Sequence, residues 1–159
     1  RLRAAIPATV AVIACAAHAA AARERSATST AATHRVPIAT YGHHQVHYEL
    51  SGEPGRRAIT FLNGLTQDAD LWQSYAEYFV PRGWRVLAYD LLGQGRSSGP
   101  VIDIELATHA ELLDSLLRQL EIHKTHLCSI SFGGIVGLDF AIRYGHRLHS
   151  LIAIAPSPS

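Results

Sequence analysis

A serine flanked by small residues is the clearest candidate for chemistry in this 159-residue sequence. The segment Ser129-Ile130-Ser131-Phe132-Gly133 follows an apolar run and precedes an apolar helical pattern, which predicts a sharp turn from a strand into a helix. A serine at the tip of such a turn projects above the sheet and can act as a nucleophile. By themselves, however, these five residues also fit an ordinary strand-to-helix loop.

Two further loops follow apolar runs that predict strands. Asn63-Gly64-Leu65 follows residues 58–62, and a glycine-containing loop from Asp90 to Ser97 follows residues 84–89. Carboxyl ends of parallel strands meet at one edge of a sheet, so we expect both loops to lie near Ser131. The residues of the second loop favour turn chemistry, and its glycines lack the G-x-G-x-x-G spacing of a dinucleotide site.

Short apolar runs alternate with helical patterns along residues 36–159. Strands are expected at 45–50, 58–62, 84–89, 126–128 and 151–155, and helices at 71–80, 105–120 and 132–144. This alternation predicts an α/β fold, an open and mostly parallel sheet with helices on both faces.

Taken in order, the three loops resemble those of the α/β-hydrolase fold family over residues 36–159. The resemblance implies that Ser131 is the nucleophile and that the backbone N–H groups of Phe132 and Leu65 form the oxyanion hole. Gly64 and Gly133 are expected to shape the loop and the turn. Asn63 replaces the usual histidine of the family. Substrate contact is one role open to it, and a hydrogen bond within its own loop is the role we favour.

The family's triad places an acid and then a histidine after the serine. No acidic residue follows Asp139, and His146 and His149 are too close to the helix after Ser131 to reach back over it. We therefore assign no catalytic acid or base. Residues 36–159 are interpreted as an incomplete α/β-hydrolase domain, inactive as a fragment.

The resemblance implies hydrolysis of an ester, a lactone or a similar small acyl substrate. An acyltransferase of the same fold is a close alternative. A second alternative is a non-catalytic truncated or binding protein. The missing triad partners favour it, and so would an unpaired sheet edge beside the last strand. The oligomeric state stays open.

Composition adds exclusions. The formal net charge is +1 with no basic run, so no nucleic-acid partner is expected. No cofactor is expected either, since the glycine spacing does not fit a dinucleotide site. The histidines His43, His44 and His47 lack a further ligand group and are interpreted as a solvated strand edge, not as a metal site. Cys128 is expected to be a buried small hydrophobic residue.

Residues 1–35 form an alanine-rich leader with basic residues at its start. A secretory signal, a lipoprotein signal ending at Cys15, a transit peptide and an over-extended translation start all fit this composition. Membrane contact is expected only in the lipoprotein case. The location stays open between the cytoplasm and export.

Overall fold

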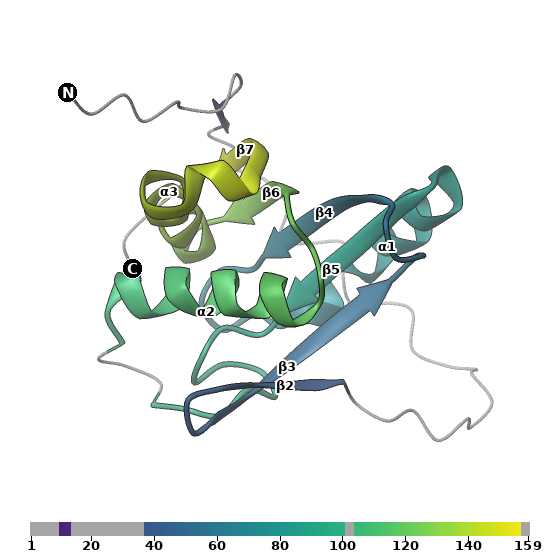
Figure 1. The fold of residues 1–159 in the computed structure, drawn as a ribbon. Helices are drawn as coiled ribbons and strands as arrows, with labels where there is room; N and C mark the ends of the chain where they lie inside the picture. The colour runs from purple at the N-terminus through teal and green to yellow at the C-terminus, as the bar shows by residue number, and fades with distance from the viewer. Residues whose placement is uncertain (1–9, 14–36, 101–103, 157–159) are drawn as a thin grey trace.

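The computed structural model describes residues 10–13, 37–100 and 104–156. A seven-stranded sheet lies at its centre (Figure 1). The strands are β1 (Val10–Ile13), β2 (Ile38–Tyr41), β3 (His44–Ser51), β4 (Arg57–Leu62), β5 (Trp84–Tyr89), β6 (Thr125–Ile130) and β7 (Leu148–Ile154). The helical segments are η1 (Ala69–Trp72), α1 (Gln73–Phe79), η2 (Val80–Arg82), α2 (Leu106–Gln119), α3 (Phe132–Tyr144) and η3 (Gly145–Arg147).

The strand order is β1-β7-β6-β4-β5-β3-β2. In this order, the five strands β1, β7, β6, β4 and β5 each run parallel to the next. Strand β3 pairs antiparallel with both β5 and β2. Because β4, β6 and β7 run in the same direction, their carboxyl ends lie at one edge of the sheet. This edge carries the loop after Leu62, the corner at Ser131 and the turn after Ile154.

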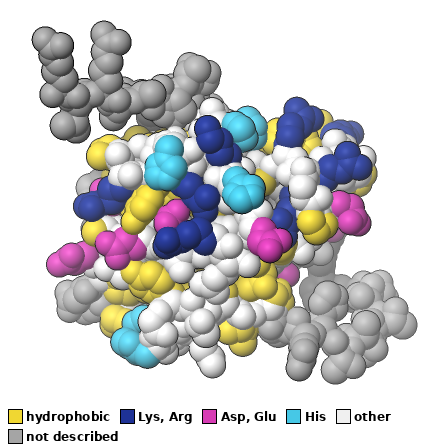
Figure 2. Space-filling model, viewed as in Figure 1, with side chains coloured by type: hydrophobic (Ala, Val, Ile, Leu, Met, Phe, Trp, Pro, Cys, Tyr) yellow, Lys and Arg dark blue, Asp and Glu magenta, His cyan; other side chains and the backbone are white. Residues whose placement is uncertain are grey.

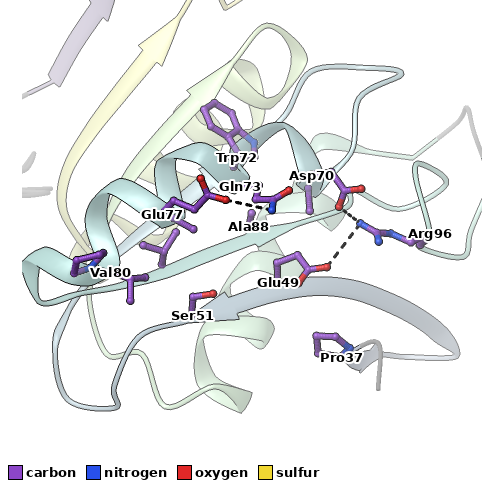
Figure 3. Close-up of a pocket in the computed structure, with 14 residues that line it drawn as sticks. Pro37, Glu49, Ser51, Asp70, Trp72, Gln73, Glu77, Val80, Ala88 and Arg96 are labelled. Carbon is purple, nitrogen blue, oxygen red and sulfur yellow. Dashed lines mark hydrogen bonds and ion pairs between the residues drawn. The ribbon is translucent and has the colours of Figure 1, made fainter. Parts of the chain in front are cut away.

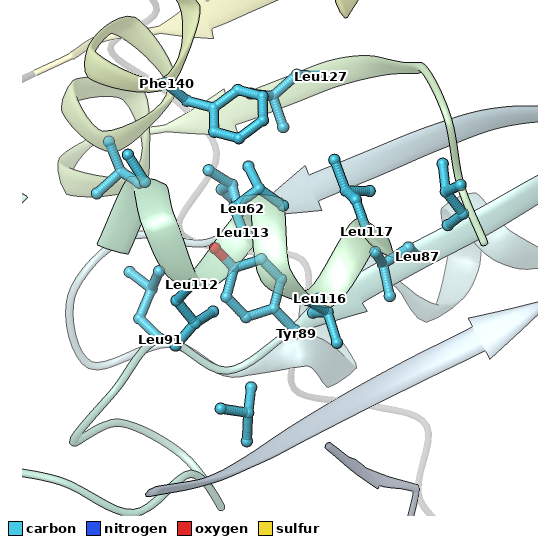
Figure 4. Close-up of a cluster of buried hydrophobic side chains, with 14 of the residues drawn as sticks. Leu62, Leu87, Tyr89, Leu91, Leu112, Leu113, Leu116, Leu117, Leu127 and Phe140 are labelled. Atoms are coloured by element: carbon cyan, nitrogen blue, oxygen red, sulfur yellow. The ribbon is translucent and has the colours of Figure 1, made fainter. Parts of the chain in front are cut away.

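Helices cover both faces, which confirms the predicted fold class. On one face, α2 and α3 enclose the main core, in which leucines of α2 meet the side chains of β4, β5 and β6 (Figure 4). On the other face, η1 and α1 cover a smaller cluster in which Phe61 stacks on Trp72 with ring centroids 4.6 Å apart. Among the described residues, no helix is long and apolar enough to cross a membrane.

The region expected to be one helix over residues 71–80 is divided among η1, α1 and η2. Its tyrosines Tyr75 and Tyr78 are exposed, and α1 has no buried residue. Strand β2 was not predicted, because its four residues are too few to show a clear alternation.

The prediction that the last strand leaves an unpaired edge is wrong. Strand β1 pairs in parallel with β7, with Val10 opposite Leu151 and Ile13 opposite Ile154. The sequence Val-Ala-Val-Ile of β1 is rich in β-branched residues, which favour a strand. The rest of the predicted leader, including Cys15, lies outside the described residues.

Candidate active site

Ser131 occupies the corner between β6 and α3. Its backbone has φ 53° and ψ −123°, a region that residues with a side chain rarely adopt. The Ser131 N–H donates to the carbonyl of Ile154 at 2.9 Å, and the Ser131 carbonyl accepts from the Gly134 N–H at 2.8 Å. Hydrogen bonds to the neighbouring strand and to the first turn of α3 therefore hold this strained corner in place.

Small residues around the corner allow α3 to approach the sheet closely. A Cβ atom on Gly133 would lie 2.4 Å from the Asn63 carbonyl oxygen, and one on Gly137 would lie 2.7 Å from Ser129 Oγ. Ser129 is buried and its hydroxyl donates to the Ile152 carbonyl at 3.2 Å. Serine is tolerated at this position because its backbone φ is not positive and its hydroxyl has an acceptor.

The loop after β4 lies against Ser131. A Cβ atom on Gly64 would be 3.1 Å from Ser131 Cβ and 3.5 Å from Ser131 Oγ. The Asn63 side chain is buried and donates through Nδ2 to the Gln67 carbonyl at 2.7 Å. The expected hydrogen bond of Asn63 within its own loop is confirmed.

Some backbone N–H groups at this edge have no hydrogen-bond partner among the described residues. Within the described part of the chain, neither the Leu65 N–H nor the Phe132 N–H donates a hydrogen bond, whereas Gly64, Thr66 and Gly134 all donate. Phe132 begins α3, so its N–H lies at the positive end of the helix dipole. Such a pair can bind an oxygen that carries negative charge.

Backbone strain is concentrated at the same edge. Four residues other than glycine have positive φ, and three of them, Thr66, Ser131 and Ala155, follow the carboxyl ends of β4, β6 and β7 in the described residues. Thr66 has φ 61° despite its β-branched side chain. Strain of this kind is typical of functional sites and persists only where the surroundings hold it.

The interpretation of the histidine cluster as a solvated edge is wrong for His47, which is buried. Its Nδ1 lies 3.0 Å from Oδ2 of the fully buried Asp90. Asp90 also accepts from the backbone N–H groups of Ala69 at 2.6 Å and Arg96 at 2.8 Å. Asp90 thus supports its own turn, as expected, and also ties β3 and the start of η1 to that turn.

The predicted turn chemistry of the glycine-containing loop is confirmed. Gly93 and Gly95 have φ 72° and 52°, a conformation that favours glycine. The Ser97 hydroxyl donates to the Asp90 carbonyl at 2.7 Å and accepts from the His47 N–H at 3.0 Å.

His109 on α2 is a neighbour of the corner, and nothing in its spacing along the sequence marks it as part of the site. It is 3% exposed, and its ring meets the Phe132 ring edge to face, with centroids 5.6 Å apart. Burial lowers the pKa of His109 to about 4. Within the described residues, no histidine or carboxylate forms a hydrogen bond with Ser131 Oγ, and no group of three or more ligand residues could hold a metal ion.

A separate hollow of about 760 Å³ lies between α1 and strands β3 and β5 (Figure 3). Its apolar wall includes Trp72 and Val86, and its rim carries Arg96, which pairs with Asp70 and Glu49. None of the residues around Ser131 lines it. On the face shown in Figure 2, basic and acidic side chains are intermixed.

The family model described as alpha/beta hydrolase fold matches residues 57–159. The chain is 32% identical over 107 residues to 3-oxoadipate enol-lactonase 2 of Acinetobacter baylyi, and 33% identical over 115 residues to 2-hydroxy-6-oxo-6-phenylhexa-2,4-dienoate hydrolase of Comamonas testosteroni. These matches cover 67% and 70% of this chain, but only 40% of each relative. Among solved structures, the enol-lactonase of Burkholderia xenovorans superposes with a TM-score of 0.69 at 26% identity, over 74% of this chain and 45% of that enzyme.

The chain therefore belongs to the α/β-hydrolase fold family, as its three loops indicated. The relatives named above are hydrolases, and two of them are enol-lactonases. The chain spans about 40% of the length of the curated relatives.

Proposed function

We propose that this chain carries the nucleophile and the oxyanion hole of a serine hydrolase that acts on an ester, a lactone or a similar acyl compound. The observation that carries the proposal is the strained corner at Ser131, with φ 53°, against which the Gly64 loop packs. A serine at such a corner faces the loop edge where open α/β sheets bind ligands.

In the proposed reaction, Ser131 Oγ attacks the acyl carbon while a base removes the hydroxyl proton. The carbonyl oxygen becomes an oxyanion and accepts from the Leu65 and Phe132 N–H groups, which have no other partner in the described residues. Collapse of the tetrahedral intermediate expels the alcohol or enol, and water then releases the acid from the acyl-enzyme.

The general base and its orienting acid are proposed to come from a part of the natural protein outside these residues. His109 is a poor candidate because burial lowers its pKa to about 4 and its ring packs on Phe132. The length of the relatives, of which this chain spans 40%, leaves room for both groups. With the base placed there, we propose that residues 1–159 alone are inactive.

The test is labelling of the natural full-length protein with a fluorophosphonate probe. We expect Ser131→Ala to abolish labelling. Ser150→Ala is the matched control, because Ser150 is a half-buried serine on the neighbouring strand β7 and should not affect labelling. Labelling that survives in Ser131→Ala would refute the assignment of the nucleophile.

A further inference from the structure

Two glutamine side chains hold the backbone on either side of Leu65. The Gly64 N–H donates to Gln67 Oε1 at 2.9 Å, and the Thr66 N–H donates to Gln94 Oε1 at 2.8 Å. The peptide that carries the Leu65 N–H lies between these two fixed groups. Of the three consecutive N–H groups at residues 64–66, only that of Leu65 has no hydrogen-bond partner among the described residues.

The two glutamines come from different parts of the chain. Gln67 lies in the same loop, and its backbone carbonyl also accepts from Asn63 Nδ2 at 2.7 Å. Gln94 lies in the loop after β5 and is 9% exposed. Its backbone is held in turn, because the Gln94 N–H donates to Leu91 and the Gln94 carbonyl accepts from Ser97.

Both side chains act on a strained segment. Thr66 has φ 61°, so the backbone would relax towards negative φ if it were released. Its hydrogen bond to Gln94 opposes that rotation, which would also turn the Leu65–Thr66 peptide, the unit next to the one that carries the Leu65 N–H. Gln67 Oε1 lies 3.1 Å from the position that a Cβ atom on Gly64 would occupy, and Ser131 Oγ lies 3.5 Å from the same position. The Gln67 carboxamide and the Ser131 hydroxyl thus both lie next to Gly64.

We propose that Gln67 and Gln94 are positioning residues that hold the Leu65 N–H in place as an oxyanion donor. The inference rests on the proposed function of Ser131 and deepens it. A carboxamide suits this role, since it accepts an N–H bond without bringing negative charge next to the developing oxyanion. A carboxylate at either position would accept the same bond and oppose catalysis.

The test compares variants of the natural full-length protein on an activated ester such as p-nitrophenyl butyrate. We expect Gln67→Leu and Gln94→Leu each to lower kcat by about 10²-fold, the size of effect seen when a catalytic group is misplaced by about 1 Å, with little change in KM. The inhibition constant of a trifluoromethyl ketone, which mimics the tetrahedral oxyanion, should rise in proportion to the loss in kcat/KM. If the glutamines only stabilise the fold, the inhibition constant should not rise in proportion to the loss in kcat/KM.

The conservative variant separates geometry from charge. Gln67→Glu keeps an acceptor for the Gly64 N–H but adds a negative charge, so its activity relative to wild type should recover as the pH is lowered and the new carboxylate becomes protonated. Gln67→Leu should show no such recovery. Gln73→Leu, an exposed glutamine on α1, is the matched control and should retain wild-type kcat.

The outcomes distinguish the two proposals. If Ser131→Ala remains active, the proposed function fails. If Ser131→Ala is inactive but Gln67→Leu and Gln94→Leu keep wild-type kcat, the positioning role is overturned and the nucleophile stands. Gln67 is exposed, so its variant tests the idea even if the buried Gln94 variant fails to fold.

Discussion

His109 should make the stability of the fold depend on pH in the mildly acidic range. The folded protein holds His109 neutral, because burial lowers its pKa from 6.5 to about 4. In the unfolded chain the imidazole binds a proton below about pH 6.5. Between these values the unfolded state binds more protons, so the free energy of unfolding falls as the pH falls and levels off below about pH 4. At 1.36 kcal/mol per pKa unit, the full effect is about 3 kcal/mol.

The perturbation is His109→Leu, which removes the titrating ring from a helix face already rich in leucine. At pH 7.5 the change in stability should be within about 1.5 kcal/mol, because the substitution is similar in volume and also removes a buried nitrogen, Nδ1, that has no partner in the described residues. Between pH 6.5 and pH 4, His109→Leu should gain about 3 kcal/mol relative to wild type.

Urea unfolding of the natural full-length protein at several pH values measures this difference. Carboxylates also titrate in this range, but they do so in both proteins, and the difference between the two curves isolates His109. His43→Leu, at an exposed histidine, should follow the wild-type curve. Parallel curves for wild type and His109→Leu would refute the assignment of a buried neutral imidazole beside Phe132.

Two further predictions concern packing and thiol reactivity. Gly133→Ala should lower the free energy of unfolding by about 1–3 kcal/mol and reduce labelling of Ser131, because its Cβ would lie 2.4 Å from the Asn63 carbonyl oxygen. Gly134→Ala, whose Cβ would lie 3.1 Å from Pro156, should lower it less when both variants are unfolded with urea. Cys128 was expected to be buried but is half-buried. Desolvation still raises its pKa to about 11, so in a Cys15→Ser background it should react with a thiol reagent at pH 7.5 about 10²-fold more slowly than an ordinary cysteine; a rate near that of free cysteine would contradict this desolvation.

The alternation of strands and helices could be predicted because most of the elements have a clear period. Strand β5 and helix α3 match their predicted ranges. A mostly apolar run bounded by Gly83 and Asp90 marks the strand, and apolar residues every three or four positions mark the helix. Helix α1 was predicted less well because its aromatic residues Tyr75 and Tyr78 face solvent. Composition alone does not tell an exposed tyrosine from a buried one.

The serine and the glycines of the site could be predicted from the sequence, but the residues that hold their loops in place could not. Gln67 and Gln94 have no distinctive spacing, and their role depends on which backbone N–H each one reaches, 3 and 28 residues away. His47 was misread because Val46 and His47 are both buried, which breaks the alternation of a half-exposed strand. His47 is buried because the loop after β5 packs on β3, where Asp90 and Ser97 form hydrogen bonds with it.

The buried carboxylate of Asp90 also bears on how the sheet edge is assembled. Its partners lie 6, 21 and 43 residues away along the chain, at Arg96, Ala69 and His47. Burying a polar group costs free energy unless its hydrogen bonds are made, so these three contacts should form together and late in folding. The loop that holds Gln94 near Thr66 then gains its order in the same cooperative step as β3, and local unfolding of either segment would release the other.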